Sequence, residues 1–469
     1  MKRLYDRLEE YSRQDYYGFH MPGHKRNTEL VDAKFPYEID ITEIEGFDDL
    51  HHAGGILKEA QERAARVFGA DETHFLVNGS TVGILSAILG STRKGDKILV
   101  ARHCHKSIHH AIYMNELVPR YLYPAFDEEM YWNGEIRAED VRTALEAEPD
   151  IRAVVIVSPN YDGVVSDVRG IARAAHEKGI PLIVDEAHGA HFGFHAYFPE
   201  RSNDLEADIV IQSLHKTLPS LTQTALLHIN GEIADRKKIR KYLDMLQSSS
   251  PSYVFMASLD ACVDFVDSEE GKNAFDIYAQ RLKEIREKLQ MMQHLKLLEA
   301  GRYDPSKIVI SVVNTNMTSH ELYEKLLNDY HLQMEMVAGT YLIAMTSVAD
   351  TKEGLDRLSQ ALLEIDRELE SGEEPLEISG ELPRLVQVET PFSIAEKQEQ
   401  DMGESILWKQ SEGRISMEYA YLYPPGSPVI VPGERISREA VELLSFYEQQ
   451  KFQIEGIQEK GRIKVLRNE

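Results

Sequence analysis

Cysteine and long apolar runs are scarce in this sequence of 469 residues. Its two cysteines, Cys104 and Cys262, lie far apart and lack the spacing of metal ligands, so we predict no disulfide framework and a reducing compartment. No run of about 18 or more apolar residues occurs, which argues against a membrane span. The first ten residues are charged throughout and lack the apolar core of a signal peptide. We therefore expect a cytoplasmic protein without a membrane partner.

Basic residues are also in deficit. Lysine and arginine total 52 against 78 aspartate and glutamate residues, which gives a net charge of −26. A phosphate backbone would be repelled by this balance, so no nucleic-acid partner is expected. The excess of acid is compatible with cationic small substrates, although it serves first to keep a protein in solution.

What the sequence does have is length enough for several domains. We predict an N-terminal arm over residues 1–30, a large domain over 31–270, a small α+β domain over 271–370 and a C-terminal domain over 371–469. In the large domain, apolar runs alternate with helix-length segments, which predicts an α/β domain with a mainly parallel sheet. The strand-like runs lie at 75–77, 97–100, 153–157, 182–184, 209–211 and 224–227.

Two of these runs end in reactive side chains. One leads into Ser213 and Lys216, and the run before it ends at Asp185. Ligands of open α/β sheets bind at the carboxyl ends of strands, so the lysine and the aspartate should meet. A lysine amine forms a Schiff base with pyridoxal phosphate (PLP), and a carboxylate keeps the PLP ring nitrogen protonated. We therefore predict a PLP site, although each residue alone also suits a solvated loop lysine or a turn-capping aspartate.

Hydroxyl groups near these strand ends suit a phosphate. Gly79 permits a turn into a helix whose first residues, Ser80 and Thr81, present hydroxyl and backbone N–H groups to an anion. By itself this is also an ordinary helix N-terminus. Ser213 and His215, on either side of Leu214 before Lys216, are further candidate phosphate donors, and Ser158 after the run at 153–157 is a candidate cofactor contact.

Histidines complete the predicted site. His105 is a candidate to stack on the cofactor ring and to move protons near the reacting carbon. His188, three residues after Asp185, is a candidate contact of the phenolic oxygen of PLP, or else a core histidine. The cluster of His103, His105, His109 and His110 contains one i, i+4 pair and no suitable carboxylate, so no metal is predicted.

Together these motifs resemble the Orn/Lys/Arg decarboxylase family of fold-type I PLP enzymes, in its short bacterial form without the N-terminal receiver-like domain. The resemblance spans nearly the whole chain, at residues 19–25 (FHMPGHK), 49–51 (DLH), 76–81 (LVNGST), 105–107 (HKS), 158–164 (SPNYDGV), 184–191 (VDEAHGAH), 213–217 (SLHKT), 249–253 (SSPSY) and 423–428 (YPPGSP). It implies a PLP-transferase large domain with a mainly parallel seven-stranded sheet, a smaller α+β domain and a C-terminal α+β region.

The resemblance also implies roles. Lys216 would be the Schiff-base lysine, Asp185 the partner of the ring nitrogen and His105 the stacking group, with the phosphate held by Ser80, Thr81, Ser213 and His215. The enzyme would be a homodimer or a higher homo-oligomer with active sites at the interface, where Ser249 or Ser250 would reach the neighbouring subunit's phosphate.

The implied reaction is decarboxylation of a basic amino acid to a polyamine-type amine and carbon dioxide, with arginine slightly favoured over lysine and ornithine. Glu418 and His24 are the candidate substrate contacts. An aminotransferase or a carbon–sulfur lyase is the alternative, with Arg414 or Arg435 available for a substrate α-carboxylate. A non-catalytic protein that has kept the fold is the alternative of a different class.

Overall fold

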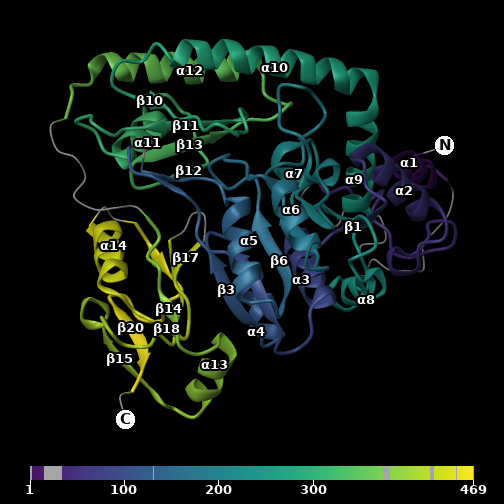
Figure 1. Ribbon diagram of the computed structural model, residues 1–469. Helices are drawn as coiled ribbons and strands as arrows, with labels where there is room; N and C mark the ends of the chain where they lie inside the picture. The colour runs from purple at the N-terminus through teal and green to yellow at the C-terminus, as the bar shows by residue number, and fades with distance from the viewer. Residues whose placement is uncertain are drawn as a thin grey trace.

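A seven-stranded sheet forms the centre of the large domain (Figure 1). The computed structural model describes residues 3–14, 34–129, 131–372, 381–422, 427–449 and 452–467. In the order β1-β9-β8-β7-β6-β2-β3, the strands are Glu72–Leu76, Ala225–Ile229, Ile209–Gln212, Leu182–Asp185, Ile151–Val157, Lys97–Ala101 and Val118–Leu122. All neighbours from β8 to β3 are parallel, whereas β9 is antiparallel to both β8 and β1. The mainly parallel seven-stranded sheet expected from the sequence is confirmed.

Helices cover both faces of this sheet because its strands are apolar on both sides. On one face the core is built with α3 (Gly79–Ser91), α4 (Lys106–Met114) and α8 (Arg236–Leu246). On the other face it is built with α5 (Ala138–Ala147) and α6 (Val168–His176). Successive residues of β7 alternate between the two cores: Ile183 belongs to the first, and Leu182 and Val184 to the second.

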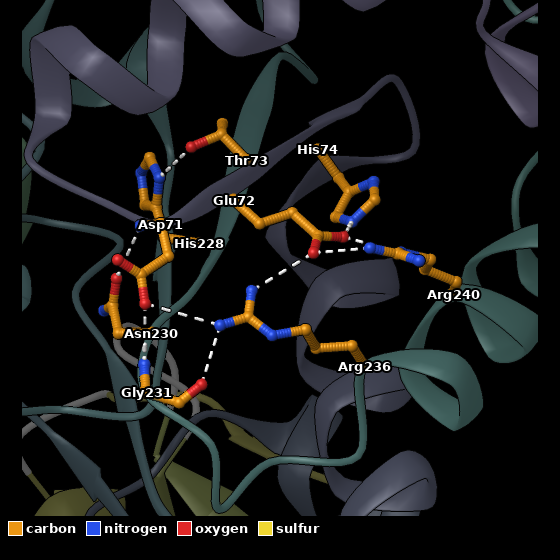
Figure 2. A network of polar contacts seen from close by, with 9 residues as sticks. All are labelled: Asp71, Glu72, Thr73, His74, His228, Asn230, Gly231, Arg236 and Arg240. Carbon is orange, nitrogen blue, oxygen red and sulfur yellow. Dashed lines mark hydrogen bonds and ion pairs between the residues drawn. The ribbon is translucent and has the colours of Figure 1, made fainter.

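The edge strand β1 is held by charge as well as by backbone pairing (Figure 2). Glu72 accepts hydrogen bonds from Arg236 and Arg240 of α8 and lies 2.6 Å from the His74 ring nitrogen. Although burial opposes it, hydrogen bonds from His74 and Arg240 hold the pKa of Glu72 well below its usual range. On the opposite side of β1, the Thr73 hydroxyl lies 2.7 Å from Nδ1 of His228. This network fixes the strand that leads directly into α3.

The N-terminal helix α1 (Leu4–Ser12) packs against α9 (Tyr253–Asp267), and α2 (Ile56–Phe68) lies beside them. Leu4 and Leu8 are fully buried, and the Leu4 backbone N–H donates to the Asp260 carboxylate at 2.9 Å. Residues 1, 2 and 15–30 of the predicted arm lie outside the described residues.

The small domain is an antiparallel sheet of order β10-β11-β13-β12, made of Lys296–Leu297, Lys307–Ser311, Tyr341–Met345 and Met336–Val337. Two long helices, α10 (Glu269–Leu289) and α12 (Lys352–Glu368), run along its outer side at the top of Figure 1. The remaining helix is α11 (Ser319–Asn328). The expected α+β domain is thus present.

The C-terminal region forms three small antiparallel sheets at the lower left of Figure 1. Their strands are β14 (Val386–Gln387) with β18 (Glu434–Arg435), β15 (Gly403–Leu407) with β20 (Arg462–Leu466), and β17 (Ser427–Ile430), β16 (Ala420–Leu422) and β19 (Ile454–Glu455). They accompany α13 (Pro391–Glu399) and α14 (Arg438–Gln449). A buried ion pair between Arg102, directly after β2, and Glu434 joins this region to the large domain.

Short elements complete the chain: β4 (Phe126–Asp127) and β5 (Trp132–Asn133) form a hairpin, and α7 (Leu214–Thr217) follows β8. Short 3-10 helices lie at Leu50–His52, Ser202–Leu205 and Trp408–Gln410. Within the described ranges, none of the helices has the length and apolarity needed to cross a membrane. The three groups of sheets fall inside the three predicted domains, whose boundaries stay predictions.

Candidate active site

A cavity of about 430 Å³ opens at the carboxyl ends of the large-domain strands. Because β9 is reversed between β8 and β1, strand β1 also ends at this edge. Polar residues that follow β1, β2, β6, β7 and β8 line one side of the cavity. The small domain adds Met336, Val337, Ala338 and Tyr341, and the C-terminal domain adds Leu443, Tyr447 and Phe452.

Lys216 reaches this cavity from α7, one turn after β8. Burial lowers the pKa of the Lys216 amine, and the negative charge of Asp185 opposes the shift. Its Nζ lies 3.0 Å from Nε2 of His188. A lysine whose ammonium form is disfavoured is a better nucleophile toward a carbonyl group.

Asp185 is the last residue of β7 and faces the same cavity. It is 4% exposed, and its Oδ1 accepts a hydrogen bond from the Ala187 backbone N–H at 3.1 Å. Burial raises the pKa of Asp185, and Lys216 opposes this rise. A buried carboxylate is stabilised by a cationic partner, and a pyridinium N–H is one. The chemistry of this position therefore fits PLP.

The N-terminus of α3 lies at one end of the cavity. Ser80 Oγ is 2.6 Å from Ser213 Oγ, and Thr81 lines the cavity beside them. Asn78 makes no side-chain capping bond to α3, and the Gly79 N–H donates to the Gln223 carbonyl oxygen at 2.9 Å. An anion at this helix N-terminus would therefore be bound by N–H groups that follow Gly79. Gly79 has a φ of +71°, a conformation that L side chains rarely adopt. The structure thus brings together Ser80, Thr81 and Ser213, three of the four residues that were predicted to hold the phosphate.

His215, the fourth predicted phosphate ligand, also lines the cavity. Its Nδ1 lies 2.8 Å from the Thr224 carbonyl oxygen, and only a ring N–H can make that hydrogen bond. Burial lowers the pKa of His215. A neutral His215 therefore presents an acceptor at Nε2, and the ring donates to a phosphate from this nitrogen only when it is protonated.

His105 lies at the N-terminus of α4, where its Nδ1 accepts a hydrogen bond from the Ser107 backbone N–H at 3.2 Å. The ring is open to the cavity, yet enough protein surrounds it that burial lowers the pKa of His105 to about 4. At neutral pH the imidazole is therefore uncharged, with its proton on Nε2. An uncharged ring is suited to stacking on a cofactor and is a weak proton donor.

Three predicted site residues do not line the cavity or lie outside the described residues. The Ser158 hydroxyl accepts from the Ser166 N–H at 3.1 Å and is not part of the cavity lining. The Glu418 carboxylate is taken up by the backbone N–H groups of Gln458 and Lys464, at 3.1 and 2.8 Å, and does not line the cavity either. His24 lies outside the described residues, as does part of the motif at 423–428.

The candidate interface and carboxylate-binding residues lie at the surface or in the C-terminal domain. Ser249 and Ser250 are exposed in the loop between α8 and α9. Arg414 donates to Glu404 and to the Leu466 carbonyl oxygen, and Arg435 donates to the Gly413 carbonyl oxygen. Neither arginine lines the cavity, so the residues named for an aminotransferase are not brought to the site.

Three residues of the site were not foreseen as functional. Tyr161 and Asp162 line the cavity, and the Tyr161 ring centroid is 4.6 Å from that of His188. Their signal was the motif at 158–164. Lys307, the first residue of β11, is 1% exposed, and its Nζ lies 3.2 Å from Nδ1 of His188. Because Lys307 is 119 residues downstream of His188, local sequence patterns contain no sign of this contact.

The fold defines the class of the protein. The Francisella novicida lysine decarboxylase LdcF superimposes with a TM-score of 0.85 at 20% sequence identity, over 99% of this chain and 81% of that structure. This likeness and the mainly parallel seven-stranded sheet show that the chain has the fold of the fold-type I PLP-dependent enzymes.

Sequence comparisons define the family. The model described as Orn/Lys/Arg decarboxylase, major domain, matches residues 2–355, and that of the C-terminal domain matches residues 382–460. An uncharacterized Bacillus subtilis protein, YaaO, is 34% identical over 99% of both chains. An arginine decarboxylase of the same organism is 31% identical over 94% of this chain and 92% of that protein. The chain belongs to the Orn/Lys/Arg decarboxylase family and is a PLP-dependent carboxy-lyase.

Proposed function

We propose that this chain decarboxylates a basic amino acid to a polyamine-type amine and carbon dioxide, with arginine as the favoured substrate. One observation carries the proposal: Lys216, Asp185 and the Ser80–Ser213 hydroxyl pair face a single cavity at the carboxyl edge of the sheet. Arginine is favoured over lysine and ornithine because the Bacillus subtilis relative described above is named an arginine decarboxylase.

The roles of the residues follow from their chemistry. When bound, PLP supplies an aldehyde that condenses with amines and a ring that withdraws electrons from the substrate α-carbon. Lys216 supplies the amine, and Asp185 holds the proton of the ring nitrogen. Ser80, Thr81 and Ser213 hold the phosphate, while His105 covers the ring.

A proton must replace the departing carboxylate at the α-carbon. The candidate donors are His105 and Lys216. The low pKa of His105 leaves its ring uncharged at neutral pH, so the proton comes from Lys216 as an ammonium, which it becomes by taking up the proton that the substrate amine gives up. In its neutral form, His105 serves to cover the ring and exclude water from it.

For the distal cation of the substrate we propose Asp162. This residue lines the cavity, is 6% exposed and accepts a hydrogen bond from the Tyr341 hydroxyl at 2.9 Å. Burial raises the pKa of Asp162 to about 6, and Tyr341 and Lys307 offset the rise only in part. A substrate cation would supply the missing positive charge, and two oxygens suit the fork of a guanidinium.

The pH dependence of substrate binding tests this role. The cation binds the ionised carboxylate, so we expect KM to rise as the pH falls through about 6, the pKa of free Asp162. Asp162→Asn should raise KM for arginine and remove that dependence, while Asp329→Asn, at the C-terminal cap of α11, serves as a control. An Asp162→Asn enzyme with the KM and pH profile of the wild type would exclude Asp162 as the cation partner.

The reaction itself is tested by supplying arginine, lysine and ornithine to the PLP-loaded enzyme. Carbon dioxide and the matching amine are the expected products, with the highest kcat/KM for arginine. Formation of keto acid without carbon dioxide would instead show an aminotransferase, and the absence of turnover would favour a non-catalytic protein. Lys216→Ala should abolish turnover, whereas Lys296→Ala, an exposed position in β10, should leave it unchanged.

We also propose that the enzyme works in the cytoplasm as a homodimer. Leu221, next to the lining residues Thr222 and Gln223, is 46% exposed, so a second subunit that covered this side of the cavity would bury it. Light scattering should give twice the mass of the chain. Leu221→Asp should shift the protein toward monomers, and an unchanged mass would remove Leu221 from the interface.

A further inference from the structure

Ser248, in the loop between α8 and α9, links two of the sequence motifs. Its carbonyl oxygen lies 2.8 Å from Nε2 of His51, which belongs to the motif at 49–51. Its backbone N–H donates to Oδ1 of Asn78 at 3.1 Å, and Asn78 belongs to the motif at 76–81. Through Ser248, the motif at 49–51 is therefore connected to the segment that leads into α3.

The contact with Ser248 fixes a proton on the His51 ring. A carbonyl oxygen can only accept, so Nε2 carries the proton that is donated to Ser248. Nδ1 lies 3.3 Å from the Asp244 carboxylate, and the His51 side chain is 10% exposed. The turn that carries the ring is itself held, because Asp49 Oδ1 accepts from the His51 backbone N–H at 2.9 Å. His51 is thus a fixed donor to Ser248.

The residue before Ser248 fixes the same segment of β1. Gln247 is 8% exposed, and its Oε1 accepts from the Val77 N–H at 3.0 Å. Its Nε2 donates to the Phe75 carbonyl oxygen at 3.3 Å. Gln247 and Ser248 therefore hold the chain from the end of β1 to Asn78, which directly precedes α3.

Ser248 also sets the orientation of the Asn78 amide. A backbone N–H can only donate, so Oδ1 faces Ser248 and Nδ2 lies on the other side of the planar amide group. Asn78 lines the cavity together with Ser80 and Thr81. No residue that the structure describes accepts a hydrogen bond from Nδ2. Its two N–H groups can therefore serve a ligand in the cavity.

A phosphate in this cavity depends on uncharged donors. Among the described residues that line it there is no arginine, and Lys216 is the single lysine. In the proposed function, Lys216 bonds to the PLP aldehyde and does not serve the phosphate. A phosphate carries roughly two negative charges at pH 7 and accepts several hydrogen bonds. The hydroxyl groups of Ser80, Thr81 and Ser213 supply three donors, and the Asn78 amide would add two more.

We propose that Asn78 is a further ligand of the PLP phosphate, and that His51 is a positioning residue that acts on Asn78 through Ser248. His51 holds the Ser248 carbonyl oxygen, and the Ser248 N–H turns the Asn78 amide so that its donors meet the anion. The opposite orientation would place the amide oxygen, which can only accept, against phosphate oxygens. The inference rests on the proposed function, in which the phosphate lies at the N-terminus of α3.

The test compares the binding of PLP and of pyridoxal, which lacks the phosphate, to the cofactor-free protein. Asn78→Ala removes the two donors, so the Kd of PLP should rise about 10- to 100-fold, the range for a hydrogen bond to a charged group. The Kd of pyridoxal should stay unchanged, because pyridoxal has no phosphate. Asn78→Asp keeps an acceptor for Ser248 but places a carboxylate against the phosphate, so it should weaken PLP binding further.

A second set of variants tests His51. His51→Phe keeps an aromatic ring without an N–H, so it should weaken PLP binding, by less than Asn78→Ala does, and leave pyridoxal binding unchanged. His51→Gln keeps a side-chain N–H donor and should restore part of the affinity for PLP. His52→Phe alters the neighbouring histidine, whose side chain is 81% exposed, and should behave as the wild type.

Two results with Asn78→Ala would overturn the proposal: an equal loss of affinity for PLP and pyridoxal, which indicates a structural role, or a wild-type Kd for PLP. A wild-type Kd in His51→Phe would refute the positioning role. If Asn78→Ala does not fold, a crystal structure of the PLP-loaded wild type decides. In that structure Nδ2 should lie within about 3.2 Å of a phosphate oxygen, and a longer distance excludes Asn78 as a ligand.

The failure of this inference is distinguishable from that of the proposed function. Borohydride trapping and peptide mapping show which lysine of the wild type carries PLP. An adduct on another lysine contradicts the function assigned to Lys216. An adduct on Lys216, with unchanged affinity for PLP in Asn78→Ala, contradicts only the roles of Asn78 and His51.

Discussion

The buried ion pair between Arg102 and Glu434 gives the sharpest stability prediction. Both side chains are fully buried, and two guanidinium N–H groups of Arg102 donate to the Glu434 carboxylate at 2.8 and 2.9 Å. The Val431 N–H donates to the same carboxylate at 2.8 Å. Arg102 also donates to the Val429 carbonyl oxygen and lies over the Tyr121 ring. The pair thus joins the end of β2 to the C-terminal domain.

Glu434→Gln leaves the Arg102 charge buried without its counter-charge. Removing one partner of a buried pair costs about 3–5 kcal/mol, because the remaining charge stays desolvated. The amide nitrogen of the new glutamine is a donor, and it would face the N–H donors that the Glu434 carboxylate oxygen accepts from. We expect the double variant Arg102→Met with Glu434→Gln to recover part of this loss, because it buries no unpaired charge.

Tryptophan fluorescence isolates the relevant domain. The sequence has two tryptophans, Trp132 in β5 and Trp408 in the C-terminal domain, so a Trp132→Phe background leaves Trp408 as the sole reporter. Guanidinium titration of cofactor-free protein, followed at Trp408, then gives the free energy of unfolding of that domain without assuming that the whole chain unfolds in one step.

An exposed ion pair serves as the control. In the same domain as Trp408, Arg438 donates to Glu442 at 2.7 Å, and the Glu442 side chain is 51% exposed. Glu442→Gln should cost about 0.2–1 kcal/mol, because water screens this pair. The reasoning is refuted if Glu434→Gln lowers the free energy of unfolding by no more than Glu442→Gln does.

Three further predictions concern the frame around the site. Leu8→Ala should lower the free energy of unfolding by about 2–5 kcal/mol, because Leu8 is fully buried in the core and truncation leaves a cavity; a loss below about 1 kcal/mol would show that α1 is not docked there. Gly83→Ala should cost about 1–3 kcal/mol, because a Cβ would lie 2.7 Å from Leu76 and 3.1 Å from Ile211; a neutral result in urea unfolding would contradict the close approach of α3 to the sheet. Glu72→Gln should cost about 1.5–3 kcal/mol at pH 7. Because the pKa of Glu72 is low in the folded protein, its contribution is complete above the ordinary glutamate pKa and is lost as the pH falls toward the folded value, so the difference between wild type and variant in thermal melts should shrink in acid.

Most of the large-domain strands were predictable, because each is a continuous apolar run. The runs at 97–100, 182–184 and 209–211 became β2, β7 and β8. Strand β3 was not foreseen, because Pro119 in its interior argues against a strand. It is tolerated because β3 is an edge strand, paired only with β2 in the sheet.

The candidate site was predictable where it depends on strand ends. Four of its residues lie at the end of an apolar run or shortly after it: Lys216, Asp185, Ser80 and Ser213. Parallel strands bring such ends together at one edge of the sheet. The residues that bind the substrate were less predictable from the sequence. Glu418 follows a plausible motif, yet its carboxylate is used by two backbone N–H groups of its own domain, which no local pattern reveals.

By itself, the sequence determined the class of chemistry. Its continuous apolar runs alternate with helix-length segments, which predicts a mainly parallel sheet, and the lysine and the aspartate stand at the ends of two of these runs. Only the tertiary structure decided the hydrogen-bond partners around that lysine. His188 is recognisable from its strand end, but Lys307 reaches it from another domain. The physical reason is that hydrogen bonds act over about 3 Å in space, whatever the separation along the chain.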